Sequence, residues 1–192
     1  MDFDHLLADA KKEESRPRSE ILTVIKATEF FKNLGAEELD AVSKCIIEKT
    51  FRAGEILIAE GTPGEYFFLV KRGKVAVEKM TAAGPVMLAR LSSGQCFGEM
   101  SLIENYPTSA TVSALEDSEI LMIGRLDLNV LLNWNTVLAA KMWKAFTEML
   151  SQRIRVMNEK LLDAIQDGKG AASAKQSCEI IERAIGIEKA GA

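Results

Sequence analysis

The stretch FGEMSLIENYPTSATV, residues 97–112, holds the side chains whose types and spacing best suit the binding of a small polar ligand. A glycine followed by the start of a helix presents free backbone N–H groups, which can hold an anion. Glu99 follows Gly98, and its carboxylate is only an acceptor, which suits hydroxyl donors. We call residues 97–110 the cassette. Its candidate ligand-binding residues are Phe97, Gly98, Glu99, Met100, Ser101, Leu102, Pro107, Thr108, Ser109 and Ala110.

A series of short β segments is predicted to position this cassette. Glycine and proline turn signals recur from residue 51 onward, which is typical of a small antiparallel barrel or sandwich. Before them, Leu39, Val42, Ile46 and Ile47 have helical spacing, which predicts a helix from about Gly35 to Ile47. The predicted strands are Glu55–Ala59, Tyr66–Lys71, Lys74–Met80, Val86–Leu91, Thr111–Ala114 and Glu119–Ile123.

A long helix is predicted after the β segments. Asn135 is a plausible N-cap, and Gly168 is a plausible stop after about Asp167. The apolar stripe on this helix continues beyond the length that a small barrel can cover, and exposed apolar stripes usually mark an interface. We expect the stripe to form the seam of a homodimer. Its members are Trp143, Phe146, Leu150, Ile154, Met157 and Leu161.

Length and charge narrow the class of protein. The chain has 192 residues, enough for one compact domain with a helical extension. Its net charge of −4 argues against general affinity for nucleic acid or for an anionic membrane. Only small and polar residues follow the long helix, so we expect no DNA-binding domain.

The reactive residue types are too scattered to predict an enzyme, a metal site or a cofactor. Cys45, Cys96 and Cys178 lie far apart, which is typical of reduced thiols in a cytosolic protein. His5 is the only histidine, so neither a haem nor an iron–sulfur site is expected. No signal peptide and no stretch of about 18 apolar residues is found. We expect a cytoplasmic protein without a membrane span, an enzymatic activity or a cofactor.

The glycine spacing resembles that of the cyclic nucleotide-binding domain family, which includes the catabolite activator protein and kinase regulatory subunits. Residues 97–110 are similar to the family's phosphate-binding motif F-G-E-x-A-L-x(4)-P-R-x-A. The resemblance implies a mainly β fold, a jelly-roll β-roll with flanking helices and a long C-terminal helix. It divides the chain into a polar N-terminal segment (1–28), a β-roll with its helices (29–134), a lid or dimerisation helix (135–167) and a tail (168–192). Other matching segments are FRAGEIL (51–57), EGTPGEYFFLV (60–70), GKVAV (73–77) and LSSGQCFGE (91–99).

The same resemblance implies roles for the cassette residues. Glu99 corresponds to the glutamate that accepts the ribose 2′-hydroxyl, and neighbouring backbone amides hold the cyclic phosphate. The family's arginine, which neutralises that phosphate, is Thr108 here. Thr108 and Ser109 can donate neutral hydrogen bonds but bring no charge. Losing one partner of a buried charge pair costs about 2–5 kcal/mol, so binding is expected to weaken about 30- to several-thousand-fold.

Three alternatives remain open for this site. A basic residue from elsewhere, one of Arg90, Lys71, Lys79 or Arg153, could replace the missing arginine. The pocket could hold a ligand that carries no anionic phosphate. Glu99 could instead be structural, with its carboxylate capping the amides of its own turn.

The sequence therefore favours a non-catalytic regulatory module that acts through protein–protein contacts, with an unidentified partner and with weak or no cyclic nucleotide binding. The first alternative is a cAMP or cGMP sensor whose ligand repositions the long helix. The second is a structural assembly subunit.

Overall fold

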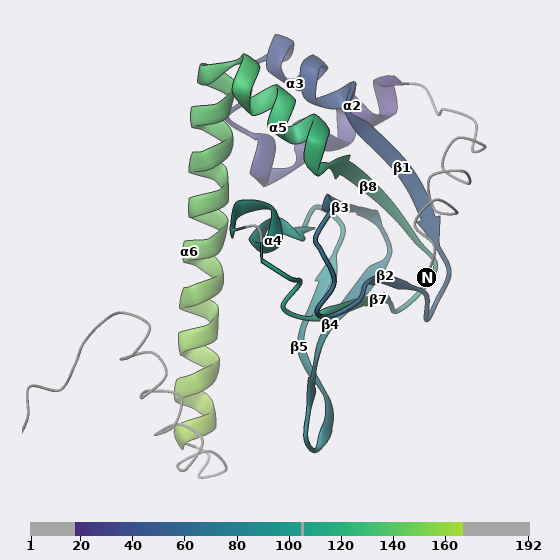
Figure 1. Cartoon of the computed structure of the whole chain (residues 1–192), viewed down its shortest axis with the longest axis vertical. Coiled ribbons are helices and arrows are strands. Elements are labelled where there is room, and N and C mark those ends of the chain that lie inside the picture. Colours follow the sequence, from purple (N-terminus) through teal and green to yellow (C-terminus); the bar gives the residue numbers. More distant parts are fainter. Residues whose placement is uncertain (1–17, 105, 167–192) are drawn as a thin grey trace, which may run out of the picture. The chain divides into compact units, whose positions relative to one another are not determined.

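The computed structural model describes residues 18–104 and 106–166 (Figure 1). Contacts divide the chain into two compact units, one ending at Phe146 and the other beginning at Thr147. Among the described residues, the helical elements before the strands are α2 (Arg18–Ala27), η1 (Glu29–Phe31) and α3 (Ala36–Ser43). The strands are β1 (Ile46–Phe51), β2 (Ile56–Ile58), β3 (Tyr66–Arg72), β4 (Lys74–Thr81), β5 (Gly84–Ser92), β6 (Cys96–Phe97), β7 (Thr111–Ala114) and β8 (Ser118–Gly124). The remaining helices are α4 (Glu99–Glu104), α5 (Arg125–Trp134) and α6 (Thr136–Gln166).

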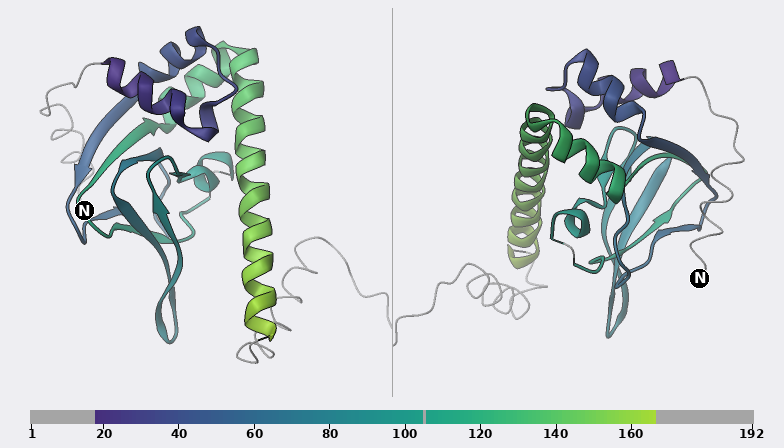
Figure 2. Two further views of the ribbon diagram at one scale, coloured as in Figure 1. Left: turned by 180° about the vertical axis from the view of Figure 1, so that it is seen from behind. Right: turned by 45° about the horizontal axis from the view of Figure 1, so that its top comes forward.

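The strands form two four-stranded sheets, which confirms the predicted β-roll with flanking helices. One sheet has the order β1-β8-β3-β6 and the other β2-β7-β4-β5, and every pairing is antiparallel. The helices α2, α3 and α5 gather at one end of the roll, and the β4–β5 hairpin projects from the other (Figures 1 and 2).

Strand β3 is apolar on both faces because it separates two cores. Phe68 and Val70 point into the roll and join the cluster that also contains Val75, Phe97 and Ile120. The intervening side chains face the other way, since successive side chains of a strand alternate. One of them, Phe67, packs against Phe30 and Phe146, with ring centroids 4.9 Å and 5.3 Å away. This second core packs the helices onto the roll.

Strand β1 corrects the predicted helix that continued to Ile47. Helix α3 ends at Ser43, and β1 begins at Ile46, where it pairs with Ile123 of β8. The apolar spacing of Ile46 and Ile47 also fits a strand with both faces partly covered. Six ladder pairs with β8, far away in the sequence, therefore decide the conformation.

Helix α6 begins close to the predicted residue. The side-chain oxygen of Asn135 accepts the backbone N–H of Leu138 at 2.9 Å, which is an N-cap interaction. In the first turns Leu138 and Met142 are buried, and so is Phe146 at 1% exposure. Phe146 was predicted to belong to the dimer seam. It lies instead in the core of its own unit, because Phe30 and Phe67 form its pocket.

The predicted seam residues farther along α6 are more exposed than Phe146. Ile154 and Met157 are exposed to 59% and 67%. Leu150 and Leu161 are half-buried.

Within the described ranges, no helix combines the length and the apolar character that crossing a membrane requires. The predicted segment 168–192 and most of 1–28 lie outside the described residues.

Candidate functional site: the cassette

The cassette begins on β6, the short strand that anchors it to the roll. Phe97 pairs with Phe68 of β3. The two rings stack almost parallel, with centroids 4.8 Å apart and planes inclined by 4°. Both side chains belong to the inner core, so the start of the cassette cannot shift without disturbing that core.

Gly98 is required by its backbone conformation and by its surroundings. Its φ of +83° lies in the left-handed region that side chains rarely adopt. A Cβ atom at this position would lie 2.7 Å from the carbonyl oxygen of Tyr66 and 2.8 Å from a ring carbon of Phe68. The turn into α4 can therefore approach β3 only because residue 98 has no side chain.

Glu99 starts α4 and is almost fully buried, at 1% exposure. Its Oε2 atom has no hydrogen-bond partner within the described part of the chain, although the residue as a whole has an interaction. Met100 is exposed, Leu102 is half-buried, and Ser101 lies between them in α4. The geometry thus places a buried carboxylate at the start of α4, inside the cassette.

Thr108, at the position where the family motif has arginine, faces the loop between β2 and β3. Its hydroxyl donates to the carbonyl oxygen of Ala59 at 2.6 Å and accepts the backbone N–H of Thr62 at 3.1 Å. Two backbone hydrogen bonds join the same segments: Thr108 N–H to the Thr62 carbonyl, and Gly61 N–H to the Thr108 carbonyl, both at 2.8 Å. Thr108 is buried, so its side chain fastens two loops together.

Ser109 is exposed and connects the two ends of the cassette. Its hydroxyl lies 3.8 Å from the sulfur of Met100, next to Glu99. Its carbonyl oxygen accepts a hydrogen bond from Lys79 Nζ of β4 at 2.6 Å. Ala110, which follows, is buried. A cation from another strand therefore lies directly beside the cassette.

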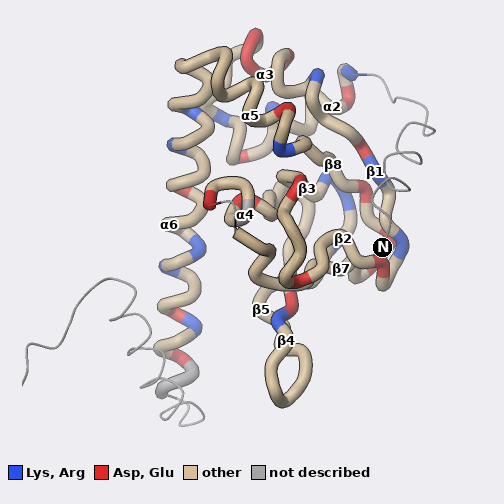
Figure 3. Tube along the Cα trace, in the orientation of Figure 1, with Lys and Arg blue, Asp and Glu red and all other residues tan. Residues whose placement is uncertain are grey.

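Lys79 is also held by Glu60, which lies in the loop after β2. Lys79 Nζ is 2.7 Å from Glu60 Oε1, and Glu60 Oε2 accepts the backbone N–H of Met80 at 3.1 Å. The hydrogen bond from Lys79, together with that from Met80, lowers the pKa of Glu60 below its ordinary value. Basic and acidic segments occur together where the β4–β5 hairpin leaves the roll (Figure 3).

The other basic candidates have different surroundings. Lys71 pairs with Glu48 at 2.7 Å and with Glu119 at 3.4 Å. The Nε of Arg90 lies 3.1 Å from the sulfur of Met87, on the same strand β5. Arg153 lies on the part of α6 that belongs to the second compact unit. Lys79, in contrast, donates a hydrogen bond to a cassette residue, Ser109.

Comparison with known families agrees with this arrangement. Residues 48–135, which run from β1 to the end of α5, match the family model described as cyclic nucleotide-binding domain. These residues form a cyclic nucleotide-binding domain. The match includes the whole cassette and both residues of the Glu60–Lys79 pair.

Relatives of the domain include kinase subunits and bacterial receptors. The chain is 31% identical over 160 residues to the cAMP-dependent protein kinase regulatory subunit of Blastocladiella emersonii, covering 81% of this chain and 39% of that protein. It is 30% identical to the Cyclic AMP receptor protein of Thermus thermophilus, covering 68% of this chain and 59% of that protein. The chain thus spans less than two thirds of either relative.

A solved cyclic nucleotide-binding domain from Methylobacillus flagellatus has the same architecture. It aligns with a TM-score of 0.68 at 26% identity, over 76% of this chain and 83% of that chain. The likeness extends beyond residues 48–135, because 76% of this chain exceeds the length of that segment.

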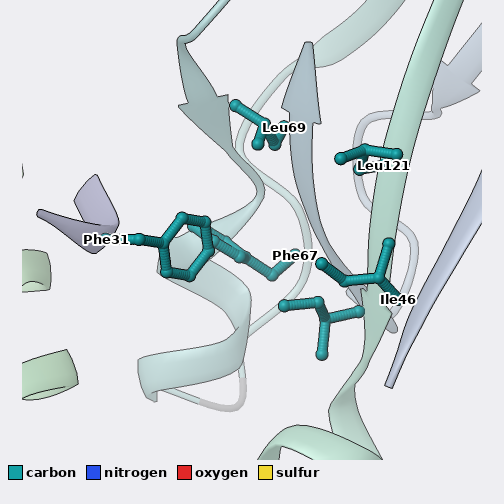
Figure 4. Close-up of a pocket in the computed structure, with 6 residues that line it drawn as sticks. Phe31, Ile46, Phe67, Leu69 and Leu121 are labelled. Carbon is teal, nitrogen blue, oxygen red and sulfur yellow. The ribbon is translucent and has the colours of Figure 1, made fainter. Parts of the chain in front are cut away.

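Two cavities of the domain lie away from the cassette. A space of about 10 Å³ is lined by apolar side chains from both sides of the second core (Figure 4). It is lined by Phe31, Ile46, Phe67, Leu69, Leu121 and Ile123. Because no polar group faces it, this space suits neither a polar ligand nor an ordered water. The second is an open hollow of about 340 Å³ beside α2, lined in part by Glu20 and Lys71.

The sequence identifies Lys79 only as one of four basic candidates and indicates no role for Glu60. The sequence does indicate the strand face on which Lys79 lies, because Lys79 follows Val75 and Val77 at two-residue spacing. No local pattern in the sequence predicts the pairing of Lys79 with Glu60, since the two residues are 19 positions apart.

Proposed function

We propose that this chain is a non-catalytic regulatory module whose cassette binds cyclic nucleotides weakly or not at all. The observation that carries the proposal is the position of Thr108. Its hydroxyl already hydrogen-bonds Ala59 and Thr62, and its side chain brings no positive charge to a phosphate. A neutral donor does not reproduce the rigid fork of an arginine.

The surrounding charges support weak binding. Lys79 is the cation beside the cassette, but the Glu60 carboxylate lies 2.7 Å from it. A phosphate that approaches Lys79 therefore also meets the negative charge of Glu60. A buried phosphate without an available positive charge loses about 2–5 kcal/mol of binding free energy. This loss corresponds to about 30- to several-thousand-fold in affinity.

Calorimetric titration of the full chain with cAMP and with cGMP tests the proposal. We expect no saturable binding with a dissociation constant below about 10 µM. Thr108→Arg should strengthen binding of both nucleotides by about tenfold or more, because it adds a guanidinium to the cassette. Saturable binding by the unaltered chain below that threshold would overturn the proposal.

The Thr108→Arg variant needs a matched control. Thr108→Val removes the same loop hydrogen bonds without adding charge, so it separates loss of the loop contact from gain of the guanidinium. We expect Thr108→Val to bind nucleotide no better than the unaltered chain.

A cyclic nucleotide sensor is the second candidate function, favoured by one observation. Lys79 donates to the carbonyl oxygen of Ser109, so a positive charge is already present beside the cassette. In that case the cationic group comes from β4 instead of from the loop itself.

The module is proposed to act through contacts made by the part of α6 after Phe146. Ile154 and Met157 are exposed there, and apolar side chains in such a row usually mark an interface. A second copy of this chain is the partner that we propose. Location in the cytoplasm and the absence of an enzymatic activity belong to the same proposal.

A further inference from the structure

Lys79 projects from the inner face of β4. Val75 and Val77 on the same strand pack into the core of the roll, and Lys79 lies two residues farther along. The bulge between β4 and β5 does not interrupt this alternation. Val77 pairs with Ala89 and Glu78 with Met87, so the extra residue is on β5. Lys79 therefore leaves β4 on the same face as Val75 and Val77, and its ammonium group reaches the Ser109 carbonyl of the cassette.

The contacts of the ammonium leave it able to bind a further anion. Of its three N–H groups, one faces Glu60 Oε1 at 2.7 Å and another faces the Ser109 carbonyl at 2.6 Å. The side chain is 47% exposed, so a ligand can reach it. Ser109 also touches Met100, and Met100 follows the buried Glu99. A ligand beside Ser109 therefore lies next to the Lys79 ammonium and close to the start of α4.

We propose that Lys79 is the cation of this binding site and that Glu60 competes with the phosphoryl group of a nucleotide for it. The inference rests on the weak-binding form of the proposed function, because it requires that the cassette still admits a nucleotide. Glu60 then sets the affinity: while its carboxylate holds Lys79, an anionic ligand gains little from the ammonium. Neutralising Glu60 makes the ammonium available to the phosphoryl group.

A purely structural role for the pair leads to different results. The Glu60–Lys79 contact also joins the loop after β2 to the β4–β5 hairpin, and this alone would explain its presence. In that case changes to either residue would alter the stability of the chain. They would not discriminate between a charged and an uncharged ligand.

The experiment compares four single variants and one double variant of the full chain. Glu60→Gln keeps an oxygen that can accept the Met80 N–H while removing the charge. Lys79→Met keeps the aliphatic stem without the ammonium. The controls are Glu116→Gln and Lys74→Met, because Lys74 is on the same strand and pairs with Glu116 at 3.8 Å. Each variant, and the double variant Glu60→Gln/Lys79→Met, is titrated with cAMP and with uncharged adenosine. Urea unfolding verifies that each one folds.

We expect Glu60→Gln to strengthen cAMP binding by about tenfold or more and to leave adenosine binding unchanged. The double variant should lose that gain, because the phosphoryl group then has no cation. Both control variants should behave as the unaltered chain does.

The two proposals fail in different ways. If folded Glu60→Gln binds cAMP no better than the unaltered chain, the role of Lys79 is overturned, and a gain in Thr108→Arg would leave the proposed weak binding intact. If the unaltered chain binds cAMP tightly, the proposed weak binding is overturned. Lys79 then keeps its role only if Lys79→Met weakens cAMP binding and leaves adenosine binding unchanged.

Discussion

At the scale of single residues, two small residues shape the cassette. Thr108 hydrogen-bonds the loop between β2 and β3, and Gly98 lets α4 begin directly against β3. Neither role depends on a ligand. The cassette can therefore keep its backbone conformation with a threonine at position 108.

Gly98→Ala should destabilise the chain by about 3 kcal/mol or more, since the left-handed backbone costs about 1–2 kcal/mol and the Cβ also meets the Tyr66 carbonyl. Gly54 has the same φ of +83° and nothing within 4 Å of its Cβ position. Gly54→Ala should therefore cost only the backbone strain. Urea unfolding measures both, and equal losses would show that the contact with β3 is unimportant.

Thr108→Val is expected to lower the free energy of unfolding by about 1 kcal/mol, because the hydroxyl no longer bonds the Ala59 carbonyl and the Thr62 N–H. The Ala59 carbonyl keeps the Thr62 hydroxyl as a donor at 2.8 Å, so it is not left unsatisfied. The comparison is Ser109→Ala, at the exposed neighbouring position, which should change stability by no more than about 0.5 kcal/mol. Chemical denaturation followed by circular dichroism gives both values. A neutral result for Thr108→Val would mean that the loop contact contributes little.

At the scale of elements, one ion pair ties α3 to the beginning of α6. Lys141 Nζ lies 2.9 Å and 2.7 Å from the two carboxylate oxygens of Glu38. The backbone N–H of Gly35 donates to the same carboxylate at 2.6 Å, which closes the first turn of α3. The hydrogen bond from Lys141, followed by that from Gly35, lowers the pKa of Glu38 below its ordinary value of 4.5.

Because the pKa of Glu38 is lowered in the folded state, the ion pair stabilises the protein more at neutral pH than at acidic pH. The charged carboxylate stabilises the folded state, so its contribution is complete above pH 4.5 and is lost as the pH falls through the lower folded-state pKa. Lys141→Met should cost about 1 kcal/mol near neutral pH and clearly less at about pH 3. Urea titrations at both values test this. The exposed Lys26→Met is the control, and an equal loss at both pH values would contradict the prediction.

At the scale of the whole molecule, α6 has a buried part and an exposed apolar part. Its first turns are part of the core through Leu138, Met142 and Phe146. Farther along, Ile154 and Met157 remain exposed on the predicted stripe. An association of two chains through this stripe would remove these side chains from water.

Ile154→Lys and Met157→Lys should each convert the proposed dimer to a monomer, because a buried lysine without a partner is costly. Val156 is also apolar and 44% exposed, but it lies off the stripe. Val156→Lys should therefore leave the dimer intact. Size-exclusion chromatography with light scattering measures the mass. A monomeric unaltered chain, or equal effects of all three substitutions, would refute a dimer through this stripe.

The sequence by itself determined the β-roll, the N-cap of α6 and the place of the cassette, because turn glycines and apolar periodicity act over a few residues. It did not determine the start of β1, which depends on pairing with β8, or the burial of Phe146, which depends on Phe30 and Phe67. Only the tertiary structure decided which cation lies beside Ser109. Lys79 and Glu60 come from separate segments, and their charges meet only when the roll is closed.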